Sequence, residues 1–534
     1  MSNLDARSGP EAIHHYEPLD PPLSNLNANP DLEDIYHYEP LPTTTHIRVL
    51  TLLPSSERGR VCGTLPAVSL DQAVDYTALS YSWGMNETGN ASFSHEVDIE
   101  GRRLPITRNL FECLLRLQTR NGPSRMWIDA VCINQKDVQE RSRQVQMMAE
   151  IFSTASEVLV WLGEGSDEAE DTRAYDAIPC LACHRHWEDD HDPITLKSGL
   201  PSCSVMAPLA VRLPAVMPWN SNLIDLFITM TESIIPIVER RFFTRRWIVQ
   251  EIYHGKRINL MWADHLITSE TYSTSLSWLF RFATHVLDWP DEWDAAAHVH
   301  LCILLGRSEG PFHLRASACD TIGSEPRVTL LYGMEYRRGL QCSDARDLLY
   351  SILSLDPRHN IIADYSLPIR DLFVSLSRYC LDTGEFNILL RSSCTISGLG
   401  EVPLCNLDLP SWTPEWSHFQ KQGHPLAFMP GAKIEDDGTL IFQVNIVRTL
   451  EDYMAYMGRT MGLGDILCAF TKEPPSCGSW DSLRIILPIN GRFNTYRMIP
   501  IKSVEHTKWH DIKISLLQKD GKVVFGGSQW VRIV

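Results

Sequence analysis

The feature that most constrains the fold is an alternation of short apolar runs with amphipathic, helix-like segments between residues 76 and 263. The apolar runs at 76–83, 125–133, 157–163 and 257–263 have the length and composition of buried strands. Strands that alternate with amphipathic helices form an α/β layer structure with a largely parallel sheet. Ligands of such sheets bind beyond the carboxyl ends of the strands. The sequence therefore predicts an α/β fold with any site at that edge.

Three segments between these runs show helical periodicity. The first follows Thr107, a candidate N-cap, and carries leucines on one stripe. The second begins at Asp137, which is followed three residues later by a glutamate, as in a capping box. The third, RRWIVQEIYHG at 245–255, ends at Gly255, a residue typical of helix ends.

The rest of the chain divides into regions of different composition. Residues 1–35 are polar, rich in proline and without periodicity, which predicts a disordered tail. Residues 36–263 form the predicted α/β domain, interrupted at 164–222 by an acidic and then proline-bearing segment that indicates an insertion or a long loop. We expect residues 264–390 to be mostly helical. Residues 391–534 contain short alternating runs and Asp-Gly and Asn-Gly turns, which predicts a β-rich C-terminal part.

Composition narrows the classes of function. The 534 residues carry a formal net charge of −18, which argues against a general binder of nucleic acid or anionic membranes. The 14 cysteines are irregularly spaced, and the N-terminus lacks the apolar stretch of a signal peptide. The most apolar span, 223–238, is too short to cross a bilayer and contains charges. We therefore expect a cytoplasmic protein with reduced thiols and no membrane span.

Most of the common catalytic and cofactor motifs are absent. The chain lacks GxxxxGK[ST], GxGxxG after the first strand and HExxH, and its one GxSxG sequence, at 306–310, lies in the part predicted to be mostly helical and follows none of the predicted strands. One cluster, CLACHRH, could hold zinc through Cys180, Cys183, His184 and His186. It also has the spacing of c-type haem attachment, which would need an exported protein. Because a structural zinc site usually has a second knuckle at defined spacing, a loop with clustered thiols is the simpler interpretation, and no cofactor is firmly implied.

Polar side chains gather where the first two predicted strands end. Ser80, Ser82, Trp83 and Gly84 end the first strand, and Asp129 ends the second. In a parallel sheet both groups meet at the same edge, where they could bind a ligand. Each also has a structural interpretation, because serines bond local backbone, aspartate caps turns, and tryptophan is more often found in cores.

Glu251 stands in an apolar setting within the third helical segment. Trp247 lies four residues earlier and shares its helix face. A charge in such a setting is costly to bury, so a buried carboxylate is expected either to form an ion pair or to have a direct role in function. An ion pair with Arg141 or Arg245 and a direct role in function are both open on the residues alone.

The phrases YTALSYSWG, ITRNLFECLLRLQ, MWIDAVCINQKDVQERSRQVQMMAEIFSTASEVLVWLGE and RRWIVQEI occur in this order over about residues 76–263. They resemble the fungal heterokaryon incompatibility (HET) domain, and CSDARDLLYSILSL at 342–355 and LPSWTPEWS at 409–417 look like its usual companions. The resemblance implies a role in fungal allorecognition, in which such proteins trigger programmed death of fused, incompatible cells. A non-catalytic module that self-associates or binds a protein partner is the alternative within the same family.

The HET domain is similar in pattern to TIR domains, which have a flavodoxin-like sheet and some of which cleave NAD at the nicotinamide–ribose bond. This similarity implies that Glu251 is the catalytic carboxylate and that NAD is the substrate. Cleavage builds positive charge on the ribose, which a carboxylate stabilises. Arg245 and Arg246 are candidate donors to the pyrophosphate, although a solvated position on the helix surface is the simpler interpretation. The candidate NAD-binding residues, from the strand ends and from this similarity together, are Ser80, Ser82, Trp83, Gly84, Asp129 and Trp247.

Overall fold

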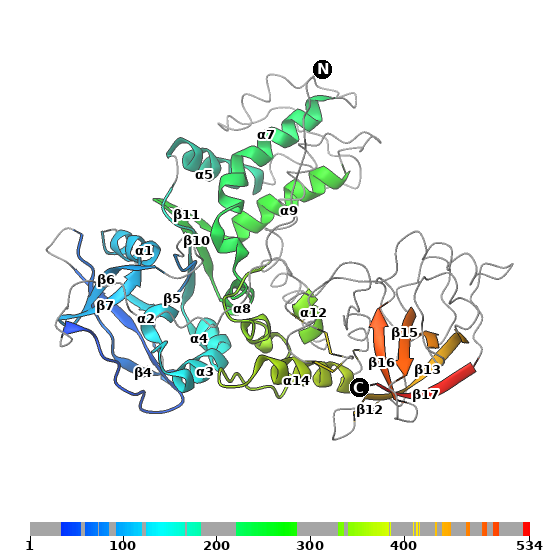
Figure 1. The fold of residues 1–534 in the computed structure, drawn as a ribbon. Coiled ribbons are helices and arrows are strands. Elements are labelled where there is room, and N and C mark those ends of the chain that lie inside the picture. Colours follow the sequence, from blue (N-terminus) through cyan, green and yellow to red (C-terminus); the bar gives the residue numbers. More distant parts are fainter. Residues whose placement is uncertain are drawn as a thin grey trace, which may run out of the picture.

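The structure of the protein is a computed structural model (Figure 1). It describes residues 34–54, 59–72, 74–84, 92–119, 124–165, 168–182, 221–285, 329–335, 340–383, 385, 409–410, 413–414 and 416, together with six strands nearer the C-terminus. The predicted tail at 1–35 lies outside these residues except for its last two positions.

A nine-stranded sheet forms the centre of the α/β part (Figure 1), in the order β11-β10-β9-β5-β8-β2-β3-β6-β7. β10, β9, β5 and β8 are parallel to one another, and antiparallel neighbours flank them on both sides. The predicted α/β fold is confirmed, although the sheet as a whole is mixed. The strands are β2 (Leu50–Leu53), β3 (Cys62–Thr64), β5 (Thr77–Tyr81), β6 (Phe93–Ile99), β7 (Arg102–Thr107), β8 (Arg125–Trp127), β9 (Glu157–Trp161), β10 (Ile258–Trp262) and β11 (His265–Thr268).

The parallel strands are the four predicted from apolar runs, and their burial explains the pattern. All five residues of β5 are buried, as are four of the five in β9. Strands covered on both faces read as continuous apolar runs rather than as alternation. If these four strands are numbered 1 to 4 along the chain, in the order β5, β8, β9 and β10, their order across the sheet is 2-1-3-4. A separate pair, β1 (His46–Arg48) and β4 (Ala67–Ser69), is antiparallel.

Helices flank this sheet, and their ends partly match the predicted caps. Asp137 caps α3, because its carboxylate accepts the backbone N–H groups of Gln139 and Glu140. The cap predicted at Thr107 is wrong: this residue ends β7, and its buried hydroxyl has no hydrogen-bond partner among the described residues. The helices are α1 (Arg108–Thr119), α2 (Asp129–Cys132), α3 (Val138–Gln146), α4 (Met148–Thr154) and α8 (Ile248–His254).

The segment predicted as an insertion or long loop at 164–222 begins with a helix. α5 (Glu168–Ala182) packs against α7 (Ser221–Val238) and α9 (Ser269–His285), which are drawn in green in Figure 1. The loop interpretation is therefore wrong for α5, while residues 183–220 lie outside the described part of the chain. None of the helices described is long and apolar enough to cross a membrane.

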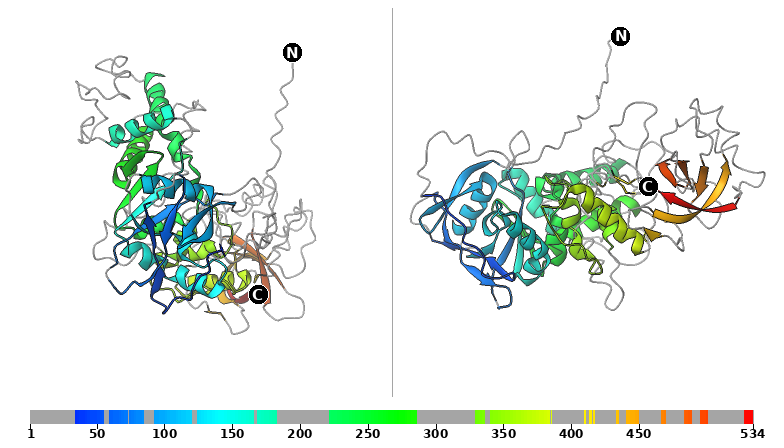
Figure 2. Two further views of the ribbon diagram at one scale, coloured as in Figure 1. Left: turned by 90° about the vertical axis from the view of Figure 1, so that its left-hand side faces the viewer. Right: turned by 60° about the horizontal axis from the view of Figure 1, so that its bottom comes forward.

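A second hydrophobic core lies in the region from 329 to 383, which we call the helical region. It contains α12 (Leu330–Glu335), α13 (Asp347–Tyr350), the 3₁₀ turn η4 (Leu353–Leu355) and α14 (Ile369–Asp382). α8 borders both cores: Ile248 and Ile252 belong to the core of the sheet, whereas Val249 belongs to the core of the helical region. In both views of Figure 2 the helical region adjoins the α/β layer.

Six strands in the predicted β-rich part form a sheet of their own in the order β12-β13-β14-β15-β16-β17. β13 and β15 overlap two of the alternating runs of the sequence, at 439–447 and 483–489. Neighbours in this sheet are antiparallel except β16 and β17. The strands are β12 (Lys433–Ile434), β13 (Leu440–Thr449), β14 (Ile466–Ala469), β15 (Leu483–Pro488), β16 (Thr495–Pro500) and β17 (Gly527–Ile533).

Gly255 ends α8, as predicted, but for a packing reason. Its φ of −61° is open to any residue, so no left-handed conformation requires glycine there. A Cβ atom would instead lie 2.7 Å from Cγ2 of Val158 and 3.1 Å from Cγ1 of Ile258. We expect Gly255→Ala to lower the free energy of unfolding by about 1–3 kcal/mol through overpacking, measured as a lower urea midpoint with an unchanged m-value.

Gly84→Ala is the matched control for this substitution. An added Cβ there would have its nearest neighbour at 3.5 Å, an ordinary contact. We expect Gly84→Ala to change the free energy of unfolding by no more than about 0.5 kcal/mol. An equal loss of stability in both variants would show that the contact with β9 and β10 is not the cause.

Candidate functional site

Ser80 and Glu251 are in direct contact although 171 residues separate them in the chain. The Ser80 hydroxyl, near the carboxyl end of β5, donates a hydrogen bond to Oε2 of Glu251. α8 turns Glu251 towards the sheet because Ile248 and Ile252, on the same helix face, pack into the core of the sheet. Ser80 is 1% exposed and Glu251 is 2% exposed, so the contact is buried.

Arg245 completes the environment of this carboxylate. Its two terminal nitrogens lie 3.2 Å from Oε2 and 3.1 Å from Oε1 of Glu251. Of the two ion-pair partners that the sequence left open, Arg245 is therefore the one in contact, whereas the Arg141 guanidinium lies 3.8 Å from the centre of the Tyr365 ring. The expectation that Arg245 and Arg246 are solvated helix residues is wrong, because Arg246 is 1% exposed and the side chain of Arg245 is 15% exposed.

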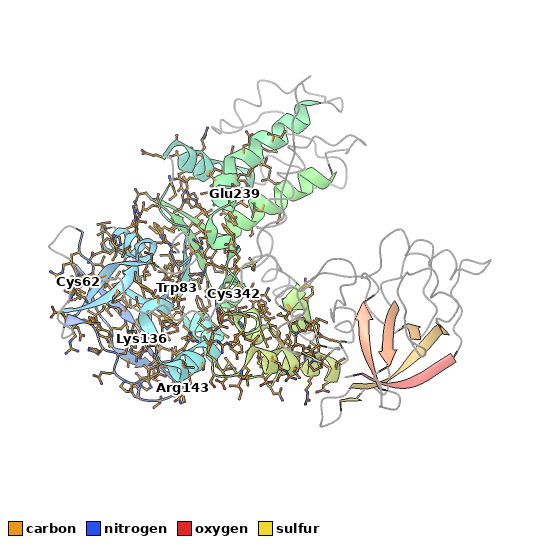
Figure 3. All side chains as sticks on the ribbon, in the orientation of Figure 1. Cys62, Trp83, Lys136, Arg143, Glu239 and Cys342 are labelled. Atoms are coloured by element: carbon orange, nitrogen blue, oxygen red, sulfur yellow. The ribbon has the colours of Figure 1, made fainter. Side chains whose placement is uncertain are left out.

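Asp129 lies next to this pair, and the charges of Arg245 and Glu251 affect its pKa. It follows β8 and begins α2, and its carboxylate accepts hydrogen bonds from Trp83 Nε1 at 3.1 Å and from the backbone N–H of Ala130 at 2.7 Å. Figure 3 labels Trp83 within the α/β part. Burial raises the pKa of Asp129 to about 6, the positive charge of Arg245 opposes this rise, and the negative charge of Glu251 adds to it. We call Ser80, Asp129, Arg245 and Glu251 the carboxylate cluster.

The raised pKa of Asp129 predicts a pH dependence of stability. Its ordinary value is 3.8 and its value in the fold is about 6, so the native state keeps a proton that the unfolded chain has already released. Stability from this proton is complete below pH 4 and is lost as the pH rises through 6. Because Asp129 is partly exposed, we expect the wild type to lose about 1–2 kcal/mol relative to Asp129→Asn between pH 4 and pH 7. Urea unfolding of both proteins at pH 4 and pH 7 measures the two free energies of unfolding. A difference between the two proteins that does not change with pH would contradict the prediction.

Ser82 is held by α1 and Gly84 by the residue before β6, and neither has a contact with Glu251 among the described hydrogen bonds. Asn109 on α1 donates a hydrogen bond from Nδ2 to the Ser82 carbonyl oxygen at 2.7 Å. The Asn109 side chain is itself held by Trp161, whose Nε1 lies 3.0 Å from Oδ1. The carbonyl oxygen of Gly84 accepts the N–H of Ser92 at 3.1 Å. These contacts shape the turn after β5, and the sequence offered no signal for the part that Asn109 has in it.

Trp247 faces away from the carboxylate cluster. It packs against both hydrophobic cores, and its indole forms a hydrogen bond with Asp347 of the helical region. Burial raises the pKa of Asp347 to about 7, which the hydrogen bond from Tyr365 opposes. The shared helix face predicted for Trp247 and Glu251 does not make the indole a partner of the carboxylate, because Trp247 is the residue before α8 and its hydrogen bond goes to Asp347.

Tyr81 is a residue of this site that sequence reasoning missed. Its hydroxyl is buried and has no hydrogen-bond partner among the described residues. Burial raises its pKa well above the ordinary value, with a further rise from the charge of Asp129 and a smaller lowering by Arg245. An unpaired buried hydroxyl is costly, so this atom has the capacity to bind a further polar group. Its position between two serines at the end of a buried strand was the available signal.

The residues of the zinc alternative are mostly outside the described structure. Cys180 lies in α5, while Cys183, His184 and His186 are not described. Among the residues that are described, no group of three or more His, Cys, Asp or Glu side chains is arranged to hold a metal ion. The zinc site stays a prediction.

Comparison with known proteins places this cluster inside one matched segment. Residues 76–251 match the family model described as heterokaryon incompatibility protein (HET). The chain is 30% identical over 409 residues to heterokaryon incompatibility protein 6, OR allele, of Neurospora crassa, an alignment that covers 70% of this chain. The chain spans 58% of that relative's length. No solved structure matches the chain significantly.

Proposed function

The chain is a HET domain-containing protein, and we propose that it is an effector of fungal allorecognition that triggers programmed death when incompatible cells fuse. The match to the HET family over 76–251, together with the likeness to a heterokaryon incompatibility protein, carries this proposal. Expression of the chain in strains of defined compatibility, followed by fusion and a count of viable compartments, tests it. Unchanged viability in every pairing would contradict the role.

We propose that the α/β domain exerts this effect by cleaving NAD. In this reaction water replaces nicotinamide on the ribose, and the products are nicotinamide, ADP-ribose and a proton. Glu251 would stabilise the positive charge that develops on the ribose. Two observations support the assignment: the four parallel strands have the order of the first four strands of a flavodoxin-like sheet, and the carboxylate cluster lies at their carboxyl ends, where such sheets bind ligands.

The conformation described is a closed one for this chemistry. Both carboxylate oxygens of Glu251 are occupied, one by Ser80 and Arg245 and the other by Arg245. A carboxylate that is 2% exposed and neutralised by arginine cannot at the same time face a ribose. Catalysis therefore requires Arg245 to leave Glu251, and Arg245 would then be free to bind the pyrophosphate of NAD.

A non-catalytic module that self-associates or binds a protein partner is the second candidate. The observation in its favour is the same buried ion pair, since structural ion pairs perturb and bury carboxylates as catalytic sites do. Nicotinamide release from NAD, followed by chromatography at high protein concentration and with crowding agents, separates the two candidates. Death of expressing cells without any release by the purified protein would support the module.

A further inference from the structure

The helical region holds the chain on both sides of Arg245. The backbone N–H of Gln341 donates a hydrogen bond to the carbonyl oxygen of Thr244 at 2.5 Å, and the N–H of Arg246 donates to the carbonyl oxygen of Gln341 at 2.9 Å. These bonds form a short parallel bridge between Arg245 and Gln341. The backbone position from which the Arg245 side chain reaches Glu251 is thus set by a residue almost a hundred positions further along the chain.

The side chain of Arg246 anchors the same segment inside the helical region. Its Nη2 donates to the carbonyl oxygens of Gly333 at 3.0 Å and of Leu348 at 3.1 Å. Burial lowers the pKa of Arg246 to about 10, which reflects the cost of enclosing its charge. Because carbonyl oxygens from two separate segments stabilise this charge, Arg246 can keep its place only while the helical region stays docked.

α8 itself is attached to the helical region by the face that carries Val249, Gln250 and His254. Ser354 donates from its hydroxyl to Oε1 of Gln250 at 3.1 Å and lies 2.8 Å from Nε2 of His254. Val249 packs into the second core. The helix is only seven residues long, so a shift of this face moves Glu251 as well.

We propose that docking of the helical region keeps Arg245 on Glu251, so that this contact between the two parts of the chain is autoinhibitory. Displacement of the helical region pulls residues 244–247 away, and the carboxylate of Glu251 becomes available. The consequence for activity rests on the proposed role of Glu251, whereas the mechanical coupling from the helical region to Arg245 does not.

The test measures how readily Arg245 leaves its partner. Phenylglyoxal modifies free guanidinium groups, and mass spectrometry of the full-length chain under single-hit conditions gives the rate at Arg245 relative to the exposed Arg143. Two variants loosen the docking: Trp247→Phe removes the hydrogen bond to Asp347, and Ser354→Ala removes the bonds to α8. We expect both to raise the relative rate at Arg245, by about tenfold for Trp247→Phe, which loses a bond to a carboxylate, and by less for Ser354→Ala, whose lost bonds go to neutral groups.

Tyr379→Phe is the matched control. The Tyr379 hydroxyl donates to Asp356 at 2.8 Å, so this variant also loses one hydrogen bond to a buried aspartate, but within the helical region. We expect its Arg245 rate to equal that of the wild type. Ser354→Ala removes only a hydroxyl, so it keeps the test valid even if Trp247→Phe folds poorly.

The outcomes separate the inference from the proposed function. Unchanged labelling of Arg245 in both loosened variants, or an equal rise in Tyr379→Phe, would overturn the coupling whatever the enzymatic result. Faster labelling together with faster nicotinamide release supports both the coupling and its consequence. Faster labelling with no nicotinamide release from any variant supports the coupling and counts against NAD cleavage.

Discussion

Glu251→Gln is expected to reduce nicotinamide release from NAD by about 10²–10³-fold, because it removes the negative charge that stabilises the cationic ribose. The amide has the shape of the carboxylate and can still accept a hydrogen bond from Ser80 or Arg245. Arg245 keeps part of its solvent contact, with a side-chain exposure of 15%, so its charge is not left fully buried. The fold should therefore survive the change. Chromatographic assay of NAD cleavage and a viability assay in expressing cells measure the two consequences.

Glu112→Gln is the control for this prediction. Glu112 forms an ion pair with Arg108 four residues earlier on α1, and Arg108 is 74% exposed. Loss of a surface pair of this kind changes stability by less than about 1 kcal/mol. A Glu251→Gln protein that cleaves NAD as fast as Glu112→Gln would exclude Glu251 as the catalytic carboxylate. Lethality retained by Glu251→Gln would favour the non-catalytic module.

The largest effect on stability is expected at the ion pair between Arg48 and Glu140. Its two hydrogen bonds measure 2.6 and 3.0 Å, and each side chain is 3% exposed. Arg48 also donates to the carbonyl oxygens of Glu39 and Cys132, and Glu140 also accepts the N–H of Asn134. The pair thus joins β1, the start of α3 and the segment before β1 at one buried point.

Glu140→Ala is expected to lower the free energy of unfolding by about 3–5 kcal/mol, because it leaves the Arg48 charge buried without a counter-charge. The double substitution Arg48→Met and Glu140→Leu should cost less than Glu140→Ala alone, since no charge then remains in the core. Urea unfolding of the three proteins gives the values, with Glu112→Gln as the surface reference. A loss below about 1 kcal/mol in Glu140→Ala would show that water reaches Arg48.

Local patterns were informative wherever burial or capping depends on near neighbours. The four parallel strands are apolar along their whole length because both faces are covered, so their positions could be predicted. The cap at Asp137 involves residues two and three positions away. The hairpin of β6 and β7 was missed, although Glu100 and Gly101 form its two-residue turn with positive φ angles of 55° and 84°. An Asn-Gly pair would have been the stronger signal.

What the sequence alone determined is the α/β class, the strands of the parallel core and the short set of polar residues from which the site is built. The tertiary structure decided which of these residues meet. Ser80 and Glu251 come into contact across 171 positions, and Arg245 rather than Arg141 neutralises the carboxylate. Trp247, four residues from Glu251, packs between the two cores and forms its hydrogen bond with Asp347 of the helical region. The physical reason is that periodicity records only whether a side chain is buried, whereas the partner of a buried charge depends on how distant segments pack around it.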